Sequence, residues 1–75
     1  MEGGDWPIET VVRMMEAAGY MHDVPREVSA TELYHRFVPP LGSRMPQLGV
    51  TAENGRVGRK HVETIRSILE DFKNS

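Results

Sequence analysis

Residues 28–40 read VSATELYHRFVPP, and this stretch carries the strongest local structural signal in the 75-residue chain. Ser29 and Glu32 have the spacing of a capping box, in which the serine hydroxyl and the glutamate carboxylate each bind a free backbone N–H at a helix start. The apolar residues on either side of the box are placed for a hydrophobic staple. The prolines at 39–40 stop a helix, because the residue before a proline avoids helical geometry. We therefore predict a short helix over 30–38.

A helix over 7–18 is predicted upstream of this stretch. Its apolar residues recur at helical spacing, and its charged residues lie between them. Pro7 fits the first turn of a helix, where a missing N–H costs no hydrogen bond, so Asp5 or Trp6 is the expected cap. Gly19 follows as a stop signal.

A third helix is predicted over 59–72, near the end of the chain. Apolar residues form a continuous stripe along it: Val62, Ile65, Ile68, Leu69 and Phe72. Helices as short as these are marginal in isolation, so we expect the three to pack against one another.

The segment 39–58 connects the second and third predicted helices, and it holds three prolines and four glycines. Asn54-Gly55 is the favoured sequence of a type I′ hairpin turn, so residues 48–51 are placed to pair with Arg56 and Val57 in a small hairpin or wing. An ordered irregular loop and a mobile segment are the alternatives.

These elements predict an all-α fold, a small three-helix domain that is compatible with a helix-turn-helix or winged-helix-like arrangement. Residues 5–73 form the expected domain, with a flexible start at 1–4 and a tail at 74–75. The expected core consists of Trp6, Ile8, Val11, Val12, Met15, Leu33, Phe37, Val62, Ile65, Ile68, Leu69 and Phe72, with Leu41, Leu48 and Val50 covering one end.

Composition excludes several classes of protein. Hydrophobic residues make up 39% and charged residues 27%, an ordinary globular balance, and the net charge of −2 argues against a strongly basic protein. Without cysteine there is no disulfide, no thiolate nucleophile and no cysteine zinc site, which fits an intracellular (cytoplasmic or nuclear) protein. No apolar run is long enough to span a bilayer, so we expect no membrane partner.

The most suggestive candidate site is the stretch 54–61, NGRVGRKH, in which glycines and bases precede the last predicted helix. A helix N-terminus offers free N–H groups to phosphate, and glycines let phosphate approach the backbone. Residues 44–61 hold four bases and one acid, 4 − 1 = +3. We therefore predict a nucleic-acid-binding site made of Arg44, Arg56, Gly58, Arg59, Lys60 and His61.

The four residues 55–58, Gly-Arg-Val-Gly, superficially resemble the Gly-x-x-Gly loop of KH-type RNA-binding domains. A KH domain has a sheet and further elements after that loop, whereas only one helix follows here, so we do not assign this family. The segment also lacks the Lys-Ser/Thr ending of a phosphate-binding P-loop.

The alternative is a protein–protein interaction domain of a larger or multi-subunit assembly, using an apolar patch of Met14, Tyr20 and Met21. The three histidines match no metal-ligand spacing, and no acid–base pair or nucleophile stands out. We therefore expect a binding module rather than an enzyme, with no cofactor and no metal.

Overall fold

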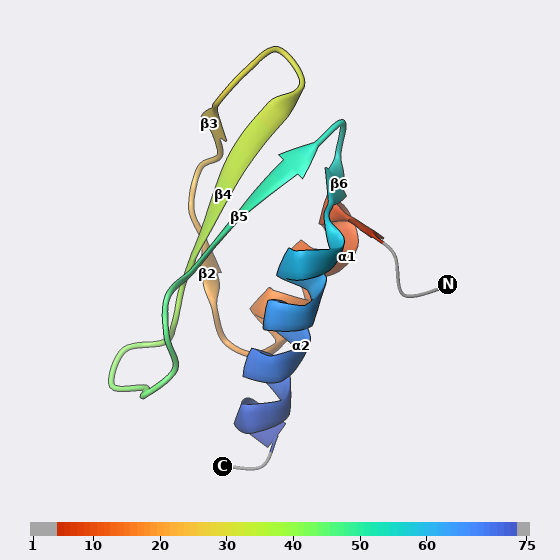
Figure 1. Cartoon of the computed structure of the whole chain (residues 1–75). Coiled ribbons are helices and arrows are strands. Elements are labelled where there is room, and N and C mark those ends of the chain that lie inside the picture. Colours follow the sequence, from red (N-terminus) through yellow and green to blue (C-terminus); the bar gives the residue numbers. More distant parts are fainter. Residues whose placement is uncertain (1–4, 74–75) are drawn as a thin grey trace.

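The computed structural model describes the backbone of residues 5–73 and the side chains of residues 5–71. It is a mixed α/β fold in which a curled antiparallel sheet packs against two helices (Figure 1). The elements in chain order are β1 (Trp6–Pro7), α1 (Ile8–Ala17), β2 (Met21–His22), β3 (Arg26–Glu27), β4 (Glu32–Val38), β5 (Leu48–Glu53), β6 (Arg56–Val57) and α2 (Arg59–Lys73). The predicted all-α, three-helix architecture is therefore wrong, and so are its helix-turn-helix and winged-helix-like variants.

The first and last predicted helices are confirmed as α1 and α2. The cap of α1 is Pro7 in an extended conformation with no side-chain hydrogen bond, so neither Asp5 nor Trp6 takes that role. At the other end, the amide of Gly19 donates to the carbonyl of Glu16 and the amide of Tyr20 donates to that of Met15. Together with the φ of +95° at Gly19, this pair of bonds is a Schellman motif.

The predicted helix over 30–38 is instead strand β4, the centre of the sheet. Leu33, His35 and Phe37 alternate with polar or exposed residues, and this period of two lets one side of the strand face the helices. The Ser29–Glu32 segment caps no helix. The hydroxyl of Ser29 accepts a hydrogen bond from the amide of Thr31 at 3.3 Å, and the segment forms the turn that joins β3 to β4.

The Asn54-Gly55 turn is present and joins β5 to β6. Both residues have positive φ, 52° at Asn54 and 79° at Gly55, as a type I′ turn requires. The residues that pair across it are Ala52 with Val57 and Glu53 with Arg56, whereas 48–51 pair with β4. The expected hairpin is therefore part of the main sheet rather than a separate wing.

The strand order is β1-β6-β5-β4-β2, and β3 pairs with the same long strand β4 as β2 does. Both helices lie on one side of the sheet (Figure 1). The core between the two layers consists of Val11, Met15, Ala18, Tyr20, Phe37, Leu48, Val50, Ala52, Val57, Val62 and Ile65, with the buried His35 among them.

Most of the predicted core is confirmed, either as fully buried residues or as partly buried ones packed against them. Leu33 is an exception at 42% exposed, because it lies near the end of β4 where the turn from β3 projects past the helices (Figure 1). Leu41 is fully exposed in the loop between β4 and β5. The side chain of Phe72 lies outside the described residues.

The left-handed turn gives a direct test of this topology. Alanine at position 55 would have to adopt a positive φ, which costs about 1–2 kcal/mol for a residue with a Cβ. We expect Gly55→Ala to lower the free energy of unfolding by that amount in urea titrations. Gly55→Asn is the matched control and should cost less, because asparagine tolerates this conformation. Equal losses in the two variants would contradict a left-handed residue at 55.

Candidate functional site

One face of the sheet is covered by neither helix of residues 5–73, and the residues on this face follow from the strand register. Side chains of directly paired residues project from the same face, so Arg26, Tyr34 and Thr51 form one row across β3, β4 and β5. Arg36 and Gly49 form the next row. The alternate rows point into the core, where His35 pairs with Val50 and Phe37 with Leu48. We call the helix-free surface the open face.

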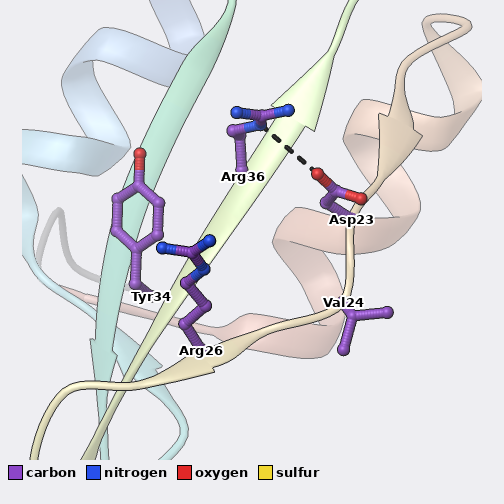
Figure 2. A pocket seen from close by; sticks show the side chains of 5 residues that line it. All are labelled: Asp23, Val24, Arg26, Tyr34 and Arg36. Carbon is purple, nitrogen blue, oxygen red and sulfur yellow. Dashed lines mark ion pairs between the residues drawn. The ribbon is translucent and has the colours of Figure 1, made fainter.

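A shallow cavity of about 200 Å³ lies on the open face, lined by Asp23, Val24, Arg26, Tyr34 and Arg36. Figure 2 shows the Tyr34 ring lying over the ribbon of β5, with the guanidinium group of Arg26 beside it. The Tyr34 side chain stays partly accessible, at 36% exposed. The cavity therefore combines an accessible aromatic ring with two arginines.

The two arginines differ in their partners. Nε of Arg36 lies 3.3 Å from a carboxylate oxygen of Asp23, in an ion pair that is about half exposed (Figure 2). No carboxylate among the described residues lies within ion-pair distance of Arg26. Two bases and one acid give this cavity a local charge of 2 − 1 = +1.

The predicted basic site is divided by the structure. Arg56, Gly58 and His61 line one cavity of about 460 Å³ with Asp5, Glu32 and Glu53. Counting His61 as neutral, that cavity has a charge of 1 − 3 = −2. The bases expected to attract phosphate therefore stand among carboxylates.

Two of those bases are already paired. Arg56 Nη2 donates to Oδ1 of Asp5 at 3.0 Å, and this contact holds the pKa of the Asp5 carboxyl below its usual range and raises that of Arg56. Arg59 lies 3.5 Å from Glu63, one helical turn along α2. Lys60 is exposed in the first turn of the same helix.

Arg44 lies beside the C-terminal half of α2, whereas the other predicted bases lie at the start of this helix or before it. It lines a cavity with Ile68 and Asp71 from the C-terminal half of the helix, whereas Gly58 and His61 are at its start. Because an α-helix rises about 1.5 Å per residue, the two ends of the 15-residue helix α2 lie well apart. The structure therefore does not join Arg44 to Arg56–Lys60 in one basic patch.

The alternative apolar patch is also divided. Tyr20 is only 3% exposed, and its hydroxyl donates to the carbonyl of Pro46 at 2.7 Å inside the fold. Met21 is 73% exposed, and Met14 is half-buried beside Trp6 and Leu69. Trp6 itself lies against α2, with the Arg66 guanidinium 5.3 Å from its ring centre.

A histidine pair lies on the opposite, helix-covered side of the sheet. Nε2 of His22 and Nδ1 of His35 are 2.9 Å apart, and the His22 ring stacks on both His35 and Phe37. Both histidines line a cavity together with Glu9 and Arg13 of α1. Nε2 of His35 is buried and has no hydrogen-bond partner among the described residues. Burial, and secondarily the neighbouring His22, lowers the pKa of His35.

This pair does not amount to a metal centre. Within residues 5–73, no group of three or more metal-binding side chains comes together. No helix in the same range is long and apolar enough to cross a membrane. His22 and His35 form a packed pair on the helix side of the sheet, in which His35 is buried and His22 is partly buried.

Comparison with protein families, with curated proteins and with solved structures finds no match to this chain. The candidate site therefore stands on its own geometry.

Sequence reasoning missed the open-face residues Arg26, Tyr34 and Arg36. On a helix over 30–38, Tyr34 would share a face with Leu33 and Phe37, and the two arginines would have no common location. The signal that identifies them is the alternation along 32–38, which places Tyr34 and Arg36 on the same side of a strand.

The lowered pKa of His35 predicts a pH dependence of stability. Below about pH 6.5, the ordinary value for histidine, the unfolded chain binds a proton at this position that the folded protein resists. We therefore expect the temperature of the unfolding midpoint to decrease as the pH is lowered from 7 to 5. Asp5, whose pKa is lowered from 3.8, affects stability only at more acidic pH.

Replacement of the buried histidine separates this effect from others. His35→Met removes the titrating group and should flatten the pH dependence between pH 7 and pH 5, whatever its effect on stability at pH 7. His61→Gln is the control, since it removes a histidine outside the buried pair. An unchanged pH profile in His35→Met would contradict the assignment.

Proposed function

We propose that this protein is a non-catalytic, intracellular module that binds single-stranded nucleic acid through the open face of its sheet. The observation that carries the proposal is the position of Tyr34 beside Arg26 and Arg36 on a surface that neither α1 nor α2 covers (Figure 2). The proposal keeps the class of ligand expected from the sequence and moves the main contact from the start of α2 to the sheet.

The chemistry of these side chains suits an unpaired strand. Arginine binds phosphate through two parallel hydrogen bonds, and its planar group also stacks on rings. Tyrosine offers a ring on which an unstacked base can lie. In a duplex the bases are stacked on one another, so an exposed ring favours single strands, loops and ends.

Local charge favours the Tyr34 end of the open face over the end that adjoins the start of α2, where the paired Glu32 and Glu53 also lie on the open face. The cavity at Tyr34 has a charge of +1, and the one beside Gly58 has a charge of −2, from the residues that line each. Among the described residues that line the second cavity there is no phenylalanine, tyrosine or tryptophan. Lys60 and Arg59 remain a candidate for auxiliary phosphate contacts, because exposed ion pairs such as Arg59–Glu63 contribute little and exchange readily.

Binding of a fluorescently labelled single-stranded oligonucleotide tests the proposal. The affinity should fall with added salt, with a slope of about −0.7 per neutralised phosphate on a log–log plot. Neutralising both open-face arginines (Arg26→Gln with Arg36→Gln) should weaken binding and reduce that slope by about 1.4. A duplex of the same length should bind more weakly than the single strand.

Neutralising Arg59 and Lys60 together (Arg59→Gln with Lys60→Gln) is the matched control. It removes the same charge from the surface predicted by sequence. Loss of binding in this variant alone would place the interface at α2 and contradict the open-face proposal, as would tight binding that ignores both pairs of substitutions.

A second candidate is a protein partner at the sheet edge formed by β2 and β3. This edge exposes apolar side chains, with Met21 at 73%, Val24 at 84% and Val28 at 58%. Unpaired strand edges with apolar side chains are places where another strand can add. The simplest partner of this kind is a second copy of the chain.

Sedimentation measures this second candidate directly. If the edge pairs with another copy, the chain should self-associate as its concentration rises, and Val24→Glu should shift it to the monomer. Leu41→Glu changes a fully exposed apolar residue in the loop between β4 and β5, away from this edge, and should leave association unchanged. A wild-type chain that is monomeric at every concentration would contradict self-pairing.

A further inference from the structure

Gly49 is the second residue of β5, in an extended conformation that any residue can adopt. What distinguishes the position is the space above it. A Cβ built on Gly49 would lie 2.7 Å from Cζ and 2.9 Å from Cε1 of Tyr34, and still closer to the tyrosine hydroxyl. Real Cβ atoms do not approach other atoms so closely, so the Tyr34 ring occupies the volume that a side chain at 49 would need.

The register explains how the ring reaches this place. Tyr34 pairs with Thr51, and Arg36 pairs with Gly49, so Gly49 is the diagonal neighbour of Tyr34 on the open face. Diagonal neighbours in a sheet lie within reach of an aromatic side chain. Figure 2 shows the ring nearly face on, over the ribbon of β5.

We propose that Gly49 is a positioning residue that lets the Tyr34 ring lie down on the sheet, so that its outer face forms a stacking site for one unpaired nucleobase. This inference rests on the proposed nucleic-acid function and specifies where a base is bound. The ring is supported from below by the backbone of β5 and is bordered by Arg26 and Arg36 in the same cavity.

The site takes one base rather than a series. Tyr34 is the single aromatic residue on the open face within the described side chains, because Phe37 and Tyr20 are buried and Trp6 is in the row that includes the buried Val57. A ring fixed on the backbone also loses little conformational freedom when a base stacks on it, which favours binding. The neighbouring arginines, which both lie on the β3–β4 side of the ring, then bind the phosphates of the stacked nucleotide.

A double-mutant cycle tests the positioning role. Stacking of a base on an aromatic ring contributes about 1–3 kcal/mol, so Tyr34→Leu should weaken binding of a labelled ten-nucleotide oligo-adenylate by about 5- to 150-fold. Gly49→Ala should weaken binding in the same direction, because the added methyl group displaces the ring. In the Tyr34→Leu background, Gly49→Ala should have no further effect, since it acts only through the ring. Tyr34→Phe should retain most of the affinity.

A measurement without ligand reports the geometry independently. The face of an aromatic ring shields nearby protons, so the Hα resonances of Gly49 should be shifted upfield in the free protein. The shift should persist in Tyr34→Phe and disappear in Tyr34→Leu. The same spectra test whether each variant is folded. We expect Gly49→Ala to fold, because alanine is at least as compatible with a strand as glycine.

The outcomes separate the two proposals. Binding that depends on Arg26 and Arg36 but is unaffected by Gly49→Ala and Tyr34→Leu would overturn the stacking site and leave the proposed function standing. A wild-type protein that binds no oligonucleotide would overturn both. Loss of binding in Gly49→Ala that persists unchanged in the Tyr34→Leu background would show that Gly49 acts on its own, which contradicts a positioning role.

Discussion

Six consecutive residue pairs join β4 to β5, from Glu32 with Glu53 to Phe37 with Leu48, and their register decides the rest of the structure. Because side chains alternate along a strand, a slip of one residue would move Phe37 and His35 out of the core and bring Tyr34 and Arg36 into it. The helices have an apolar surface to cover only in the observed register. The same pairing sets Tyr34 diagonally above Gly49 on the uncovered side.

The limits of the sequence prediction follow from individual residues. The periodicity of 8–17 and 59–73 is helical and unambiguous, and the Asn54-Gly55 turn has conformational requirements that few other pairs meet. The segment 32–38 is ambiguous, since Leu33, Tyr34 and Phe37 suit a helix face while Leu33, His35 and Phe37 suit a strand. The capping-box spacing of Ser29 and Glu32 favoured the helix, although serine is equally common in turns. Pairing with β5 and β2, which no local pattern encodes, decides the outcome.

The replacement of the predicted helix over 30–38 by strand β4 also explains why the candidate site lies on the open face rather than at residues 54–61. A helix at 30–38 leaves the basic stretch 54–61 as the most distinctive surface, whereas a strand creates a second surface that combines residues from β3 and β4. Arg26 and Arg36 are ten positions apart in the chain and become neighbours only through the β3–β4 hairpin. Charge counted along the sequence could not reveal this, nor that Asp5 and Glu53 lie beside Arg56.

The alternation along β4 has a consequence for how such a protein changes over time. Its odd-numbered positions from 33 to 37 face the helix side and its even-numbered ones the open face, so adjacent residues of one strand meet separate physical demands. Substitution at 34 or 36 can alter what the surface recognises while the interior stays packed.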